Sequence, residues 1–180
     1  TGFKWGNFDP DNGGWTDLVF YLASDETIKL YDYGSGLTQG YFEPLSAIER
    51  SSYLSIIESF SDVCKVTFRE SKSYDVDKRN ILFGSVATSF WGMSGLVGRA
   101  NFPDGSKDSG LTTMVSDWFK PHLSSLPNVY GPGSWLYAVA MHELGHSMGL
   151  AHPHHAMSGG TFPGVTNGIS SMLGDNELNS

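Results

Sequence analysis

Short segments in which apolar residues alternate with polar ones, or dominate, recur along the chain and predict β-strands. Val66–Glu70 alternates, as a strand with one buried face does. Asn80–Gly84 is more uniformly apolar, which is typical of a central strand. Gly95–Phe102 contains two glycines and an arginine and therefore fits the edge of a sheet. Together with Thr16–Leu22 and Thr112–Asp117, these segments predict a sheet of about five strands.

Two other segments have the periodicity of amphipathic helices. Ser46 and Glu49 form an S-x-x-E capping box, in which two side chains satisfy two backbone N–H groups at a helix start. The apolar residues that follow predict one buried face of a helix that ends near Ser61 and Asp62. They are Ile48, Tyr53, Ile56, Ile57 and Phe60. A second helix is predicted over Ser134–Met148.

Polar, glycine-rich and proline-rich segments connect these elements. We interpret as loops the polar stretch around Gly34, Gly36 and Gly40, the proline-containing Lys120–Gly133, and the tail from His152 to Ser180. We find no internal repeat and no linker, so we expect residues 1–180 to form a single domain. The order strand, helix, strands, helix and tail predicts an α/β (or α+β) sandwich.

Composition narrows the class of protein. The 180 residues suit one domain with a real core, and 39% apolar residues exclude a disordered segment. The net charge of −8 disfavours nucleic-acid binding, and no run of about 18 apolar residues indicates a membrane span. Cys64 is the sole cysteine, so no internal disulfide is possible, and we expect it to be a small buried residue.

The stretch His142-Glu143-Leu144-Gly145-His146 carries the candidate chemistry. Positions four apart lie on one face of a helix, so His142 and His146 can direct two imidazoles at one ion. Neutral imidazole is a good zinc ligand. Glu143 adjoins a ligand and can hydrogen-bond to a water at the metal. On the opposite face we expect apolar residues to anchor the helix in the core; these are Tyr137, Met141, Leu144 and Met148.

A third ligand requires the chain to turn after this helix. Gly149 is the expected stop, because glycine adopts the left-handed conformation that ends helices at low cost. After that turn His152 can approach the same ion. Three neutral histidines leave one position open for water, which is typical of catalytic rather than structural zinc sites.

His142–His152 resembles the H-E-x-x-H-x-x-G-x-x-H signature of the metzincin peptidases. Within that clan the chain most resembles the serralysins, along nearly its whole length. The further similar segments occur in the expected order: Lys4-Trp5-Gly6 with Leu18–Tyr21, Ser59–Val63 with Val66–Phe68, Asn80–Gly84, Ser116–Phe119, and Pro153 directly after the third histidine.

The resemblance implies a metzincin-type, two-lobed catalytic domain with a twisted mixed sheet, two long helices and a cleft between the lobes. The upper lobe would cover about residues 1–149 and the loop-rich lower lobe about 150–180. The resemblance also implies that Gly95–Phe102 forms the cleft rim and that an extended peptide pairs antiparallel with it. Arg99, Ala100 and Asn101 are then the candidate substrate-binding residues; solvated edge residues are the alternative for Arg99 and Asn101.

The implied function is that of a zinc-dependent endopeptidase, which hydrolyses peptide bonds of proteins or extended peptides with an activated water. His142, His146 and His152 would hold Zn²⁺, and Glu143 would be the general base. We further expect a secreted, extracellular monomer whose partner is a protein or peptide substrate, with neither nucleic acid nor membrane as a partner.

Metzincins place a Met-turn beneath the metal, and Met172 is the best candidate for it. Met157 is the rival, although it follows His152 by only five residues. Serralysins usually place a tyrosine two residues after this methionine, whereas Gly174 occupies that position here. Support for the transition state then comes from other groups or from zinc itself.

Other possible sites and functions have weaker sequence support. Asp9–Gly13 and Asp104–Asp108 resemble calcium loops in composition only, so Ca²⁺ lacks a clear motif and we expect turns. His154 and His155 are either solvated or additional metal ligands. One alternative function is an inactive, zinc-bearing relative that binds peptides or a protein partner. Another is a structural zinc site with a fourth protein ligand.

Overall fold

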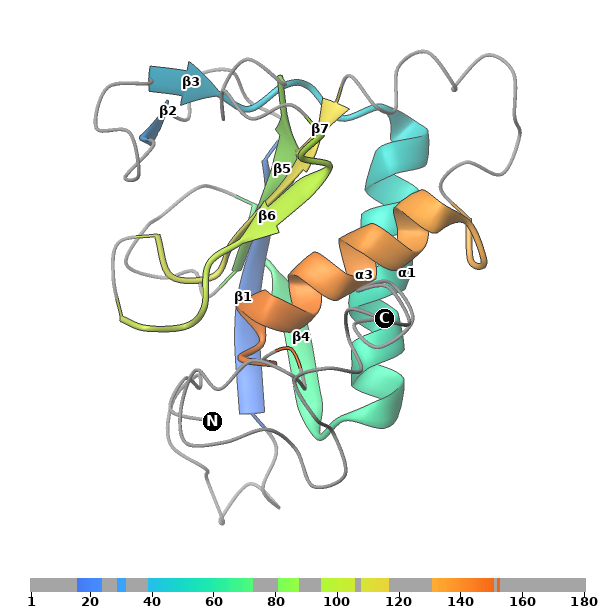
Figure 1. The fold of residues 1–180 in the computed structure, drawn as a ribbon. Helices are drawn as coiled ribbons and strands as arrows, with labels where there is room; N and C mark the ends of the chain where they lie inside the picture. Colours follow the sequence, from blue (N-terminus) through green and yellow to red (C-terminus); the bar gives the residue numbers. More distant parts are fainter. Residues whose placement is uncertain are drawn as a thin grey trace, which may run out of the picture.

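The computed structural model describes residues 16–23, 29–31, 39–72, 81–87, 95–105, 108–116, 131–150 and 152. Five strands form the main sheet in the order β4-β1-β5-β7-β6 (Figure 1). Their bounds are β1 Thr16–Ala23, β4 Val66–Glu70, β5 Ile81–Val86, β6 Gly98–Ala100 and β7 Leu111–Val115. β6 runs antiparallel to β7, and the other pairs are parallel. The predicted mixed sheet of about five strands is confirmed.

The positions of β5 and β6 in the sheet follow their sequences. β5 lies in the centre, and all six of its residues are buried, as its apolar run predicts. β6 lies at the edge, as its glycines and arginine predict, although only three residues of the predicted segment form the strand. β6 is therefore one of the two edge strands, with β4 at the opposite edge, and an edge strand can accept a further pairing partner along its outer side.

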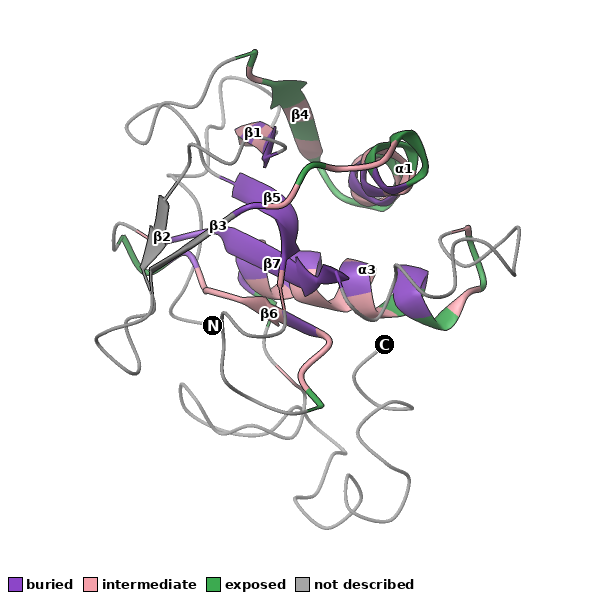
Figure 2. Ribbon diagram, turned by 90° about the horizontal axis from the view of Figure 1, so that it is seen from above, coloured by how far each residue is buried: buried purple, intermediate pink, exposed green. Residues whose placement is uncertain are grey.

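Two helices cover one face of the sheet (Figure 2). They are α1 Ala47–Val63 and α3 Trp135–Ser147. The Ser46 side chain accepts from the Glu49 N–H, while the Glu49 carboxylate accepts from the Ser46 N–H at 2.8 Å. The predicted capping box is therefore present. The Ser134 side chain caps α3 in a similar way by accepting from the Tyr137 N–H.

The core has one layer on each face of the sheet. The larger layer packs β1, β5 and β7 against both helices; its buried members include Leu18, Phe20, Phe83, Met114, Ile56 and Leu144. A smaller layer on the opposite face surrounds Phe42. Gly84 lies so close to Phe42 that a Cβ there would be 2.5 Å from Cδ1 of the ring. That glycine is needed for packing.

The buried face of α1 differs from the predicted face at one position. Tyr53, Ile56 and Ile57 are buried as predicted, but Ile48 is 54% exposed and Glu49 is buried in its place. Successive helical residues are rotated by about 100°, so Glu49, four residues before Tyr53, lies in line with the buried residues. The carboxylate is stabilised there because it accepts hydrogen bonds from the Ser46 N–H and the Ser85 hydroxyl.

Two further expectations are wrong. Cys64 is exposed because it lies where α1 ends in extended backbone, beside Val63, which is 81% exposed. The polar stretch after β1 is not all loop, since β2 Lys29–Tyr31 pairs antiparallel with β3 Gln39–Tyr41. Three-residue strands are too short to produce a clear alternation.

Several predictions fall outside the described residues. These include the lower lobe beyond His152, with the Met-turn candidates Met172 and Met157, and also His154, His155 and Asp9–Gly13. In the part of the chain that the structure describes, no helix has the length and apolar character needed to cross a membrane.

Candidate metal centre

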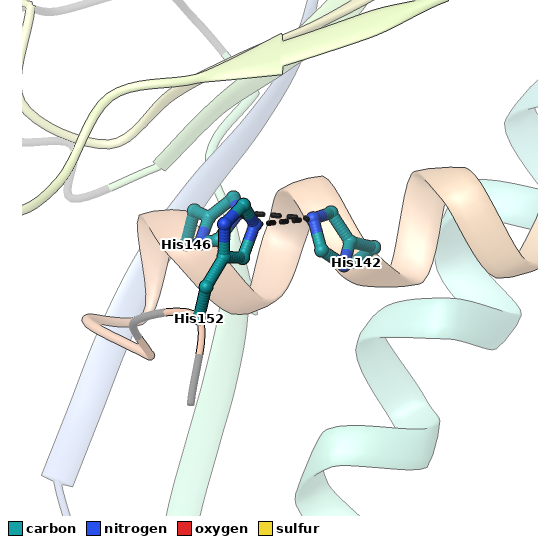
Figure 3. Close-up of side chains that lie close together, drawn as sticks. All are labelled: His142, His146 and His152. Atoms are coloured by element: carbon teal, nitrogen blue, oxygen red, sulfur yellow. Dashed lines mark hydrogen bonds between the residues drawn. The ribbon is translucent and has the colours of Figure 1, made fainter. Parts of the chain in front are cut away.

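Three imidazole rings meet beside the C-terminal half of α3 (Figure 3). His142 and His146 lie one turn apart on the helix, and His152 comes from the segment that follows. The His142 and His146 Nε2 atoms are 3.0 Å apart. The His152 Nε2 atom is 2.8 Å from His146 Nε2 and 3.0 Å from His142 Nε2. The structure thus brings the three predicted ligands together at one point, as a group that can hold a metal ion.

A glycine turn at the end of α3 returns the chain toward the site. Gly149 has φ +97°, the left-handed conformation predicted for it. The Leu150 N–H donates to the Gly145 carbonyl and the Gly149 N–H to the His146 carbonyl, both at 2.9 Å. This pair of bonds is the Schellman motif, which satisfies carbonyls at a helix end while reversing the chain. His152 follows only two residues later and so reaches the face that carries the other rings.

The same turn fixes the tautomer of His146. Its Nδ1 atom lies 2.7 Å from the Leu150 carbonyl oxygen. A carbonyl only accepts, so Nδ1 carries the hydrogen of the neutral ring and Nε2 presents a lone pair to the other histidines. The Phe102 ring lies beside His146, with centroids 5.3 Å apart. The turn thus orients the His146 imidazole and leaves its Nε2 atom free of hydrogen, as a metal ligand must be.

The three nitrogens fit a cation better than they fit one another. In a hydrogen bond one nitrogen donates and the other accepts, and each Nε2 has only one of these two roles. With three atoms and two roles, at least one of the three close pairs must consist of two donors or of two acceptors, and such a pair repels. A cation at the meeting point can accept all three lone pairs. The donor set, three neutral imidazoles, is one that zinc prefers.

Glu143 extends from the next helical position toward the edge strand. Burial raises the pKa of its carboxyl to about 7, while the hydrogen bond from the Ala100 N–H and the charge of Arg99 oppose that shift. A carboxyl whose pKa lies near neutrality suits a general base. A dication at the neighbouring histidines would further favour the charged carboxylate. Through the hydrogen bond from the Ala100 N–H, Glu143 connects α3 with β6.

Buried contacts hold α3 against the rest of the protein. The hydroxyl oxygens of Thr112 on β7 and Ser147 on α3 lie 2.5 Å apart, with both side chains buried. Near the start of α3, the Tyr137 hydroxyl lies 3.1 Å from the Ser55 hydroxyl on α1. Tyr137 and Leu144 are buried as predicted. Met141 and Met148 are partly buried and pack against the same core.

The candidate substrate-binding residues lie on β6 and directly after it. Val97 and Asn101 pair their backbone groups with β7, through Val115 N–H to Val97 O at 2.7 Å and Asn101 N–H to Leu111 O at 2.9 Å. Arg99 is in register with Thr113 between them. Because antiparallel strands alternate the direction of their backbone groups, those of Gly98 and Ala100 point away from β7. The Ala100 N–H is the donor to Glu143.

Sequence reasoning did not identify several contacts around this site. They involve Gly98 against Glu143, the Leu150 carbonyl on His146, Phe102 beside His146, and the Thr112–Ser147 pair. Only the glycine gave a signal, as an unusual residue within a strand. Asp104 begins the segment Asp104–Asp108, which resembles a calcium loop in composition only. Its carboxylate accepts from the Ser109 hydroxyl at 3.1 Å, as in a turn.

Known proteins match most of this chain. The family model described as matrixin (Peptidase_M10) matches residues 46–158, which include the three histidines and Glu143. The metallopeptidase AprA of Pseudomonas marginalis is 28% identical over 148 residues, which cover 81% of this chain and 28% of that protein. The metalloprotease AprA of Pseudomonas entomophila is 28% identical over 153 residues, which cover 79% of this chain and 29% of that protein.

The family match extends over more than half of the chain and over the elements that form the site. The chain spans less than a third of the length of the two curated relatives. These similarities confirm the prediction of a serralysin-like metzincin. The chain belongs to the matrixin family, a family of zinc metalloproteases.

Proposed function

We propose that this chain is a single catalytic domain of a zinc-dependent endopeptidase. His142, His146 and His152 hold the ion, and Glu143 is the general base. The observation that carries the proposal is the meeting of three Nε2 atoms within 2.8–3.0 Å of one another, with the Glu143 carboxylate beside His142 in the sequence of α3. When bound there, zinc supplies Lewis acidity, which polarises a peptide carbonyl and makes a nearby water more acidic.

Glu143 performs the proton transfers. The carboxylate removes a proton from the attacking water, whose oxygen then bonds to the carbonyl carbon. As the carbon–nitrogen bond breaks, Glu143 delivers that proton to the departing amine. Its position against β6 keeps it partly out of water, and the Ala100 N–H and Arg99 favour its charged form. General acid–base catalysis of this kind contributes about 10²–10⁴-fold.

The substrate in this proposal is an extended peptide that adds to the sheet as a strand beside β6. β6 is an edge strand, and the backbone groups of Gly98 and the Ala100 carbonyl point away from β7, while the Ala100 N–H donates to Glu143. Main-chain pairing would give affinity that depends little on sequence. The Arg99 and Asn101 side chains, both half-buried, would contact the peptide or flank it.

The remaining parts of the proposal rest on the sequence and its relatives. Met172 is proposed as the Met-turn methionine beneath the metal, in a lower lobe of about residues 150–180. We propose that the enzyme acts as a secreted, extracellular monomer. The AprA relatives are named as a metallopeptidase and a metalloprotease, which supports a protein or peptide substrate here.

The alternative is a zinc-bearing protein that binds peptides without cleaving them. Its support is Gly174, which stands where serralysins usually have a tyrosine. A casein digest by the zinc-loaded protein separates the two functions. The proposed function predicts fragments that vanish when a chelator removes zinc and return when zinc is restored. Casein that is bound but remains intact would favour the alternative.

A further inference from the structure

Gly98 lies on β6 directly against the side chain of Glu143. A Cβ at this position would lie 2.7 Å from Glu143 Cγ and 3.3 Å from Glu143 Cδ. It would also lie 3.0 Å from the sulfur of Met114, the residue paired with Gly98 on β7. Real Cβ atoms essentially never approach other heavy atoms closer than 3.0 Å. Any residue other than glycine would therefore displace its neighbours.

The backbone conformation does not explain this glycine. The positive-φ glycines of the described residues include Gly95 and Gly149, whereas Gly98 has an ordinary strand conformation. An alanine could adopt that conformation without strain. What excludes it is space, and the closest atom is the Cγ of Glu143, near the middle of the side chain. Movement of this carbon also moves the carboxylate.

Two features of β6 thus act on Glu143. The missing side chain of Gly98 lets the Glu143 stem lie against the strand, and the Ala100 N–H, two residues along, donates to its carboxylate. Met114, the residue on β7 that pairs with Gly98, is fully buried, so the crowded atoms have little room to move. From these contacts we propose that Gly98 is a positioning residue that sets the place of the Glu143 carboxylate.

This inference rests on the proposed role of Glu143 as the base. Because Glu143 acts in the chemical step, misplacement should lower kcat more than it raises KM. A displacement of about 1 Å in an active site can cost about 10²-fold in rate. Gly98→Ala should therefore lower kcat about 10- to 10²-fold and raise KM by a smaller factor. Zinc affinity should stay nearly unchanged, because the substitution leaves the three histidines in place.

The matched control is Gly84→Ala, which also adds a methyl group to a strand glycine. Its Cβ would meet Phe42 in the smaller core layer rather than Glu143. We expect Gly84→Ala to lower Tm while kcat per folded molecule stays at the wild-type value. If Gly98→Ala behaves in the same way, Gly98 has only a packing role and the proposal fails.

A double-mutant cycle measures the contact independently of activity. Gly98→Ala is compared in zinc-loaded wild type and in zinc-loaded Glu143→Ala, which lacks both the Cγ and the Cδ atoms. We expect Gly98→Ala to lower Tm by several degrees in the wild type and by much less in Glu143→Ala. Equal losses of Tm would overturn the inference. A protein without any peptidase activity would overturn the proposed function, while this cycle would still decide whether Gly98 positions Glu143.

Discussion

The two long helices that the structure describes, α1 and α3, both begin at a serine cap and pack on the same face of the sheet, but they end differently. α1 runs into extended backbone at Cys64, beside an exposed Val63, and then leads into β4. α3 ends in a left-handed turn at Gly149, and the histidine cluster lies at that end. The two helices show that similar starts and similar packing do not determine where a site lies.

The Gly149 turn of α3 does three things that the extended end of α1 does not. It satisfies the carbonyls of Gly145 and His146. It places the Leu150 carbonyl on the Nδ1 atom of His146. It also reverses the chain so that His152 reaches the other two rings. A metal site can thus form within a few residues of a helix end when a defined turn ends the helix and reverses the chain.

The largest expected effect is loss of the metal from the end of α3. We predict that replacing His142, His146 or His152 by alanine lowers zinc affinity by more than about 10²-fold, because even residues that only orient a ligand contribute about 10- to 10²-fold. Competition with a chromogenic chelator measures this affinity. His154→Ala is the control and should bind zinc normally. Equal loss in that control would favour a four-ligand structural site.

The next effect separates two glycines of the same motif. We predict that Gly149→Ala lowers the free energy of unfolding by about 1–2 kcal/mol, because φ is +97° there. It should also weaken zinc binding by displacing His152. Gly145→Ala should stabilise by up to about 1 kcal/mol, since alanine favours helices and its Cβ would be 3.6 Å from the nearest side-chain atom. Urea unfolding of the two zinc-loaded variants measures their changes in the free energy of unfolding. Changes of the same sign in Gly149→Ala and Gly145→Ala would refute the role of the turn.

The smallest expected effect lies at the helix starts. We predict that Ser46→Ala and Ser134→Ala each lower the free energy of unfolding by about 1 kcal/mol, because each removes a cap. Zinc affinity should stay at the wild-type value in both, as the caps are remote from the histidines. Thermal unfolding and the same chelator competition provide the measurements. Weaker zinc binding by Ser46→Ala would mean that the start of α1 is coupled to the histidine cluster at the end of α3.

The features that the sequence predicts well are those encoded by neighbouring residues. The capping box at Ser46, the i,i+4 spacing of His142 and His146, and the stop at Gly149 all follow from local geometry, and the structure has them. The mostly apolar sequence of β5 predicted its central position in the sheet, and the glycines of β6 predicted its edge position. A strand that is buried on both faces is mostly apolar, whereas a less buried strand is not.

The features that the sequence does not reveal depend on distant parts of the chain. Gly98 meets Glu143, and Thr112 meets Ser147, only because β6 and β7 pack against α3. The exposure of Cys64 depends on how α1 joins β4 rather than on its apolar neighbours. Glu49, rather than the expected Ile48, lies on the buried face of α1 by helix geometry, but the Ser85 hydroxyl on β5 that donates to its carboxylate comes from a distant part of the chain.

The central claim is that zinc at the end of α3 and the carboxylate of Glu143 together cleave peptide bonds. The most direct measurement is a map of the bonds cut in a random peptide library by zinc-loaded wild type and zinc-loaded Glu143→Ala. We predict internal cleavage by the wild type, and a rate about 10²–10⁴-fold lower in the variant, which keeps its zinc. Cleavage at the wild-type rate by Glu143→Ala, or none by the zinc-loaded wild type, would contradict the account.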